Sequence, residues 1–229
     1  MNDFFSDKTP VPFLDRVDGK LKVTGAAAYS GDYYFPNLCY GALVGSTIAK
    51  GSIASINTKE AERAPGVLAV ITHQNLPPVP GYQTKPGDKP FTGYRVFADD
   101  KIWFSGQPIA LVVADTFERA VQAATLVKTQ YKKEPHHINL EEAEKDVKPL
   151  EGKQFEDYVR NDKDAWQKSD VHIEAEYRIP IEVHNPMEPH AITVVWEWAD
   201  KVTVYEKAQS LQATQQAVMQ LFDLKKENV

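Results

Sequence analysis

The chain has 229 residues, of which 42% are hydrophobic and 25% are charged, and its formal net charge is -6 at pH 7. This composition is typical of a soluble globular protein that is large enough to bury a sizeable core. The acidic balance argues against binding to nucleic acid or to a membrane surface, because both normally need a basic face. No run approaches membrane-spanning length and no signal peptide is visible, so we expect a cytoplasmic protein.

The first third of the chain predicts an arm followed by short strands and one short helix. Residues 1–18 are polar and contain proline, which is typical of an N-terminal arm. Strands are expected at 39–49 and 52–58 around a break at 49–51, and Thr58 can cap a helix at 59–64 that Pro65 and Gly66 end. The apolar, β-branched run 67–72 predicts a strand that is buried on both faces.

The single cysteine, Cys39, lies in an apolar run that looks like a strand. Free cysteines in such runs are commonly buried, so we predict a structural residue with a reduced thiol. A nucleophilic role would require a neighbouring base that the flanking sequence does not indicate.

Residues 77–93 contain five prolines and three glycines among polar residues. This composition is incompatible with a helix or a central strand and predicts a long surface loop. Such a loop is either functional or mobile, or it is a passive insertion.

The segment 97–134 gives the clearest pattern in the sequence. Residues 109–114 predict a buried strand, and residues 129–134 predict a returning strand. Asp115 or Thr116 can cap the helix between them. The apolar positions of this helix fall at helical spacing, and they are Phe117, Val121, Ala124 and either Leu126 or Val127.

The last third predicts a connector and then a second folding unit. Residues 147–169 are charged and irregular, whereas 171–183 alternate between apolar and polar side chains as a strand does. Two strands are expected at 191–206 around a turn at 199–201. An amphipathic helix is expected at 210–224, with Leu211, Val218, Leu221 and Phe222 toward a core. Strands and helices in this order predict an α+β fold.

Histidines suggest metal ligation at two places, and neither is convincing. His136 and His137 are adjacent, so on a strand they would point to opposite faces, which favours a solvated edge. His184 and His190 flank Glu188, but the prolines between them forbid a regular helix. An extended chain would separate these two histidines by roughly 20 Å. We therefore predict no metal site, and instead a rigid segment that presents Glu188 at a pocket.

Several motifs in order closely resemble the xanthine dehydrogenase and aldehyde oxidase family. The sequences RVDGKLKVTGAAAYSGD, GALVGSTIAKGSI, AERAPGVLAVIT and FADDKIWFSGQPIALVVADTFERAVQAATLVKTQY resemble its a/b hammerhead domain. HNPMEPHAITVVWE and QSLQATQQAVMQLFDLKKENV resemble the start of the molybdopterin-binding domain. The resemblance covers about 16–229. It implies an N-terminal arm at 1–18, a hammerhead domain at 19–146, a connector at 147–169 and the beginning of the molybdopterin-binding domain at 170–229.

The resemblance implies a large subunit that hydroxylates aldehydes or N-heterocycles such as purines, with water as the oxygen source. Molybdenum held by molybdopterin would accept the electrons, and iron-sulfur clusters and FAD in partner subunits or domains would pass them on. The expected partners are the rest of the molybdopterin-binding segment and the iron-sulfur and FAD subunits, and a second copy of this chain is a further alternative.

Carried over by position, the resemblance assigns one cofactor-binding residue, Gln209. The family has a glutamine beside the cofactor just ahead of this helix, and its amide can donate to an oxo group or a phosphate. Gln209 can equally be an ordinary residue at the start of a helix. The small hydroxyl residues that usually precede this glutamine are Lys207 and Ala208 here. Glu188 matches a glutamate of the family without a derived role.

The catalytic positions of the family have no counterpart in this sequence. It lacks the glycine-rich loop and the glutamate base of the large subunit, and it has no CxxC spacing or flavin motif. We therefore expect no catalytic residue, no bound molybdenum, and no activity for the chain alone, as in a truncated chain or a split gene product. The alternative is a non-catalytic module for subunit assembly.

Overall fold

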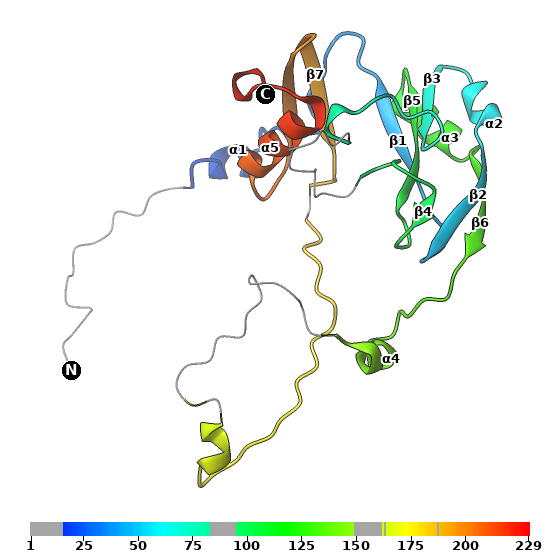
Figure 1. Ribbon diagram of the computed structural model, residues 1–229. Helices are drawn as coiled ribbons and strands as arrows, with labels where there is room; N and C mark the ends of the chain where they lie inside the picture. The colour runs from blue at the N-terminus through cyan, green and yellow to red at the C-terminus, as the bar shows by residue number, and fades with distance from the viewer. Residues whose placement is uncertain (1–15, 83–94, 149–161, 163, 187) are drawn as a thin grey trace, which may run out of the picture.

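The structure is a computed structural model that describes residues 16–82, 95–148, 162, 164–186 and 188–229. Figure 1 shows two groups of elements that lie next to each other. The first region, residues 40–133, contains strands β1 to β6 with helices α2 and α3. The second region, residues 188–229, contains β7, β8 and α5. Helix α1 (Gly19–Val23) precedes both regions. This mixture of strands and helices is the α+β fold that the sequence predicts.

The first region is built from two antiparallel sheets of three strands each. One sheet has the order β1 (Tyr40–Gly45), β5 (Pro108–Ala114) and β3 (Val67–Thr72). The other has the order β4 (Lys101–Ile102), β2 (Gly51–Asn57) and β6 (Lys128–Lys133). The two strands predicted around 49–51 are therefore present, but they enter different sheets.

The turn into β2 depends on glycine. Gly51 has a φ of +145°, and a Cβ atom at this position would lie 2.2 Å from the backbone oxygen of Lys132 in the paired strand β6. Only a residue without a side chain fits both the conformation and the space. This close approach lets the chain pass from one sheet into the other.

The strands of the first sheet are not equally buried. β5 lies in the centre of its sheet and is buried along most of its length, as predicted. β3 lies at the edge, and Leu68 and Ala69 are exposed, so the prediction that this strand is buried on both faces was wrong. An apolar strand is buried on both faces only where other elements pack against each face of its sheet, and nothing packs against one face of β3 in the described structure.

Helices α2 (Lys59–Glu62) and α3 (Phe117–Ala124) pack on the first sheet. Thr116 caps α3, because its hydroxyl oxygen accepts a hydrogen bond from the backbone N–H of Arg119 at 3.3 Å. Thr58 occupies the N-cap position of α2 as predicted, but its hydroxyl donates to Glu62 Oε1 at 2.6 Å and makes no capping bond to the backbone. The predicted apolar face of α3 is correct in part, because Ala124, Leu126 and Val127 pack against the core. Phe117 is 56% exposed, and the fully buried residues of the helix are Ala120 and Ala123. Small side chains let α3 approach the sheet closely.

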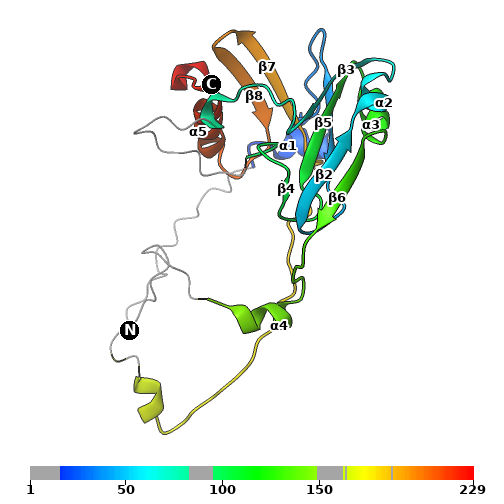
Figure 2. The same cartoon turned by 45° about the vertical axis from the view of Figure 1, so that its right-hand side comes forward.

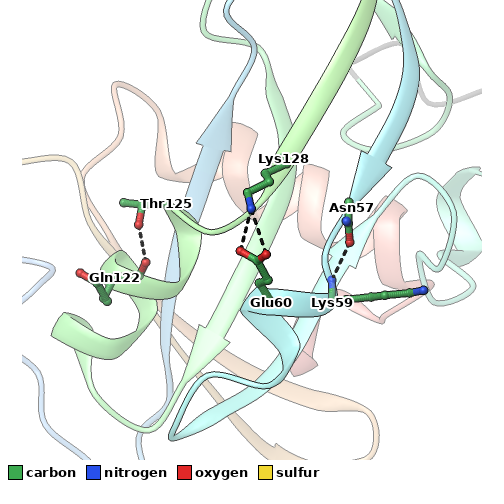
Figure 3. Close-up of polar contacts among 6 residues, drawn as sticks. All are labelled: Asn57, Lys59, Glu60, Gln122, Thr125 and Lys128. Carbon is green, nitrogen blue, oxygen red and sulfur yellow. Dashed lines mark hydrogen bonds and ion pairs between the residues drawn. The ribbon is translucent and has the colours of Figure 1, made fainter.

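Three apolar clusters form the core of the first region. One joins the two sheets through Ile48, Ile53, Ile102 and Ile109. The other two pack α2 and α3 against the first sheet, around Val70, Val112 and Ala120. Figure 3 shows polar contacts around α2, α3 and β6. Among them, Lys128 Nζ of β6 binds both carboxylate oxygens of Glu60 in α2 at 2.9 and 2.8 Å.

The second region consists of a hairpin and one long helix. β7 (Ile192–Trp198) pairs with β8 (Lys201–Glu206) around the predicted turn. α5 (Leu211–Phe222) follows, and a short 3-10 helix, η5 (Lys226–Asn228), comes after it. The helix was predicted correctly, but no residue of α5 is fully buried. Of the four residues expected toward a core, Val218 and Leu221 are half-buried, and Leu211 and Phe222 are exposed.

Between the two regions the chain leaves the sheets and returns. α4 (Leu140–Ala143) with η2 (Glu144–Asp146), and η4 (Ala165–Lys168), lie away from both regions in both views (Figures 1 and 2). The prediction of a strand at 171–183 was wrong, because these residues are exposed and form no strand in the described structure. An alternating sequence becomes a strand only when a neighbour completes its hydrogen bonds. The predicted connector 147–169 lies partly outside the described residues, at 149–161 and 163.

One contact joins the predicted loop to the second region. The described part of the loop contains the 3-10 helix η1 (Pro80–Tyr82), which packs against α5, whereas 83–93 lie outside the described residues. A Cβ atom on Gly81 would lie 2.3 Å from the backbone oxygen of Gln220. The loop therefore meets α5 backbone to backbone.

Candidate functional site

Gln209, the one predicted cofactor-binding residue, lies in the link between β8 and α5. It is exposed, and its side chain makes no hydrogen bond to any residue that the structure describes. The next residue, Ser210, caps the helix by accepting a hydrogen bond from the backbone N–H of Ala213 at 3.3 Å. Gln209 thus presents a free amide directly before the N-terminus of α5, where the helix dipole favours negative charge.

Glu188 is held in a hydrogen-bonded contact, and the prediction that it is presented at a pocket stays a prediction. Its Oε1 atom accepts hydrogen bonds from the backbone N–H of Ser30 at 3.2 Å and from the Ser30 hydroxyl at 3.3 Å. Ser30 is only 6% exposed. The carboxylate therefore serves a contact between the segment before β1 and the segment before β7.

Two further hydrogen bonds complete this contact. The hydroxyl of Thr193 in β7 donates to the backbone oxygen of Ser30 at 2.8 Å, and both residues are buried. Lys207 Nζ donates to the backbone oxygen of Glu188 at 2.8 Å. We name these four residues, Ser30, Glu188, Thr193 and Lys207, the Ser30 junction. The sequence did not indicate a role for Ser30, Thr193 or Lys207 in such a contact, because Ser30 lies 158 positions before Glu188 and the four residues form no spaced motif.

Aromatic side chains support the junction from the side of β8. Tyr33 stacks on Tyr205 with ring centroids 4.0 Å apart and planes 26° apart, and Phe35 lies 5.8 Å from the same ring. Stacked aromatic rings contribute beyond the area that they bury. The segment from Ser30 to Phe35 is therefore fixed on the β7–β8 hairpin by both polar and aromatic contacts.

A shallow groove of about 350 Å³ runs between β8 and α5. Apolar side chains dominate it, with Val204 on the strand and Leu211 and Val218 on the helix. The Thr214 hydroxyl donates to a carboxylate oxygen of Glu206 at one side of the groove. The groove reaches the first turn of α5 at Leu211 and Gln212, and Gln209 is not among its lining residues.

The histidines do not assemble a metal site. In the part of the chain that the structure describes, no group of three or more histidine, cysteine, aspartate or glutamate side chains is placed to hold an ion. His137 Nδ1 lies 3.8 Å from Glu142 Oε2, and both side chains are exposed. The prediction that His184 and His190 do not chelate a metal remains a prediction.

Cys39 is exposed, so the prediction that it is buried was wrong. The residue comes before the first strand, next to a turn in which Asn37 has a φ of 60°. Its sulfur donates to the backbone oxygen of Asn37 at 3.7 Å. The apolar run that suggested burial begins one residue later, where β1 enters the sheet.

Comparison with known proteins places both regions in one family. Residues 24–135 match the family model described as "Aldehyde oxidase and xanthine dehydrogenase, a/b hammerhead domain". Residues 146–229 match the model described as "Molybdopterin cofactor-binding domain". The chain belongs to the xanthine dehydrogenase and aldehyde oxidase family. Its motif order therefore gave the correct family.

Relatives of this family agree in sequence and in fold. The chain is 38% identical over 199 residues to the aldehyde oxidoreductase molybdenum-binding subunit of Escherichia coli, a match that covers 86% of this chain and 26% of that protein. It is 30% identical over 209 residues to the xanthine dehydrogenase of Emericella nidulans, covering 87% of this chain and 14% of that protein. The chain thus spans about a quarter or less of the length of these relatives.

Solved structures show the same fold. The aldehyde oxidoreductase from Desulfovibrio gigas superposes with a TM-score of 0.68 at 24% identity, over 93% of this chain and 25% of that one. Quinoline 2-oxidoreductase from Pseudomonas putida superposes with a TM-score of 0.72 at 19% identity, over 94% and 29% of the two chains. These neighbours support the a/b hammerhead fold followed by part of a molybdopterin-binding domain. None of the helices described in this family member is long and apolar enough to cross a membrane.

The residues present fit one edge of a molybdopterin site. The free amide of Gln209 is a donor, and the adjacent N-terminus of α5 adds backbone N–H groups beside an open groove. These groups suit the oxo and phosphate oxygens of such a cofactor.

Proposed function

We propose that this chain supplies the hammerhead domain and one edge of the cofactor site of a molybdenum hydroxylase large subunit. The match of residues 146–229 to the molybdopterin cofactor-binding family carries the proposal. When bound, the molybdenum cofactor would supply the oxidative hydroxylation of an aldehyde or an N-heterocycle, with oxygen from water. We keep the boundaries 19–146, 147–169 and 170–229 for the hammerhead domain, the connector and the molybdopterin-binding part.

In this proposal Gln209 binds the cofactor through its carboxamide N–H. Ser210 supports this role, because the cap that it forms fixes the residue after Gln209 at the first turn of α5. The orientation of the glutamine is thereby constrained from one side, while its side chain stays exposed. A donor fixed before the cofactor arrives needs no rearrangement to bind it.

The expected partners are the rest of the molybdopterin-binding domain and the subunits or domains that carry the iron-sulfur clusters and FAD. Uncovered apolar surface supports the first of these partners. Ile192, Trp196 and Trp198 on one side of β7 are exposed. Ile173 and Ile181 are also exposed, and they lie in residues 171–183, which form no strand and which we call the unpaired segment. Apolar rows of this length normally meet another protein surface. We infer that the chain is inactive until that surface is covered.

The test is to produce the chain together with a polypeptide that carries the rest of the molybdopterin-binding domain, in cells that make the cofactor. We expect a complex that contains stoichiometric molybdenum and hydroxylates an aldehyde or a purine, and no activity for the chain alone. The measurements are metal analysis and turnover. A complex that forms without molybdenum would contradict the proposal and favour the non-catalytic assembly module.

A matched pair of glutamine variants tests the assigned residue. We expect Gln209→Ala to lower the turnover of the complex by about a hundredfold, which is typical for the loss of one preorganised donor. Gln216→Ala removes an exposed glutamine about two turns further along the chain, outside the groove, and we expect turnover within about twofold of the original. Equal turnover in the two variants would show that Gln209 is an ordinary residue at the start of the helix.

A further inference from the structure

The carboxylate of Glu188 holds a residue that lies 158 positions earlier in the chain. Ser30 offers two donors, its backbone N–H and its hydroxyl, and both reach the same oxygen of Glu188 at 3.2 and 3.3 Å. The backbone oxygen of Ser30 is in turn bound by Thr193. Every polar group of this buried serine therefore has a partner, and two of the three bonds depend on Glu188.

A charged acceptor suits this position better than a neutral one. Hydrogen bonds to an ionised carboxylate are about twice as strong as those between neutral groups, although the two bonds here, at 3.2 and 3.3 Å, are longer than is usual for that kind. If the acceptor is removed, the N–H of Ser30 is left without a partner in a buried place, which costs more than the bond itself contributes. The contact with Ser30 therefore restrains the side chain of Glu188, and the backbone oxygen of the same residue is bound by Lys207.

The fixed backbone of Glu188 is the anchor for Lys207. The ammonium group of Lys207 reaches across from the end of β8 and donates to the Glu188 backbone oxygen at 2.8 Å. Lys207 is two residues before Gln209 and three before Ser210, which caps α5. The link from 207 to 210 is therefore held at one end by the Ser30 junction and at the other end by the helix cap.

We propose that Glu188 is a positioning residue that, through Lys207, sets the place of Gln209 before α5. The carboxylate of Glu188 accepts hydrogen bonds from Ser30, and its backbone oxygen accepts one from Lys207. The bound lysine restrains the link that carries Gln209. The cofactor-binding role of Gln209 rests on the proposed function, whereas the hydrogen bonds that restrain the link at 207–210 are a property of this chain. The lysine, which replaces a small hydroxyl residue of the family pattern, is the part that reaches Glu188.

Nuclear magnetic resonance of the chain without cofactor tests the restraint. In Glu188→Ala we expect the Ser30 amide to exchange with solvent about tenfold faster or more, because its buried acceptor is gone. We also expect the ¹⁵N order parameter of Gln209 to fall toward the range of flexible loops. Glu188→Gln retains a neutral acceptor, so both quantities should recover part of the way. Glu182→Gln, at an exposed position in the unpaired segment, should change neither.

The lysine variant separates positioning from folding. Lys207 is exposed, so Lys207→Met should leave the fold and the exchange of the Ser30 amide unchanged. It should lower the order parameter of Gln209 as much as Glu188→Ala does, while the matched Lys148→Met should not. An unchanged order parameter of Gln209 in both Lys207→Met and Glu188→Ala would overturn the proposal.

A second readout in the assembled complex reports on the cofactor directly. Lys207→Met and Glu188→Ala should shift the electron paramagnetic resonance signal of the reduced metal in the same direction as Gln209→Ala. A metal signal that shifts in Gln209→Ala but stays unchanged in Lys207→Met and Glu188→Ala would overturn the proposal while sparing the proposed function. A complex without molybdenum would sink the proposed function, and the order parameters would still decide the restraint.

Discussion

The two regions of the molecule bury their apolar residues to very different extents. The first region closes three apolar clusters between its sheets and helices, with Ile102 only 1% exposed. In the described part of the second region only Thr193 and Val202 are buried. Both regions have amphipathic sequences, so the difference does not lie in composition. The difference lies in how many helices and sheets each region has to pack against its own strands.

The physical reason is the small size of the hairpin sheet. A two-stranded sheet is marginally stable in water, and three or more strands or a packed helix are needed for independent stability. α5 covers part of β7, where Phe222 meets Trp196 edge to face at 5.6 Å. The other apolar side chains of β7 have no second layer in the described structure. The first region should therefore fold by itself, and the second should depend on what covers it.

The largest expected effect tests whether the core lies in the first region alone. Ile102→Ala should lower the free energy of unfolding by about 2–5 kcal/mol, because it leaves a cavity among buried isoleucines. Ile181→Ala, at a side chain that is 94% exposed, should change it by less than about 0.5 kcal/mol. Urea denaturation of both variants measures the contrast. Similar losses would show that the unpaired segment is packed in solution.

A smaller effect tests the contact that joins the regions. Gly81→Ala places a methyl group against the backbone of α5, and overpacking of this kind costs about 1–3 kcal/mol. We expect faster amide exchange in α5 with unchanged exchange in β5. The control is Gly41→Ala, where the new Cβ atom lies 3.1 Å from the flexible end of Leu111 and can be accommodated. Unchanged exchange in α5 would mean that η1 does not restrain this helix.

The smallest expected effect concerns pH and the hairpin. The hydrogen bond from Lys201, and then that from Thr203, lower the pKa of Glu197 below its usual value of 4.5. Because the folded pKa is the lower one, this carboxylate stabilises the hairpin above about pH 4.5 and the contribution is lost as pH falls through the folded pKa.

We therefore expect amide exchange in β7 and β8, measured between pH 6 and pH 3 and corrected for the intrinsic rate, to depend less on pH in Glu197→Gln. The glutamate lies at the surface, where solvent screens its charge, so the change should be slight. Glu174→Gln is the control. An identical pH dependence in Glu197→Gln and the original chain would show that the turn contributes nothing.

Local patterns predicted those elements whose partners lie nearby. Strand β5, helix α3 with its Thr116 cap, and the β7–β8 hairpin follow from periodicity and turn residues over short distances. The buried face of α3 was not predictable in the same way. Ala120 and Ala123 are buried because the helix approaches the sheet closely, and hydrophobicity ranks them below Phe117 and Val121.

The failures at longer range have a common cause. The alternation at 171–183 is typical of a strand, but hydrogen-bonding partners are set by topology, which a single segment does not encode. The candidate site divides in the same way. Gln209 was assigned through the family resemblance, and its role stays a prediction, whereas the Ser30 junction joins residues 158 positions apart and leaves no local signal.

The Ser30 junction also imposes an order on events during synthesis. Ser30 leaves the ribosome long before Glu188, and at 5–20 residues per second the interval is about 10–30 s. During this time the segment from Ser30 to Phe35 has none of the partners that hold it in the folded chain, while the sheets of the first region can already close. Docking of this early segment is therefore a late step in biogenesis, and a nascent chain that stalls before Glu188 would expose Tyr33 and Phe35 to chaperones.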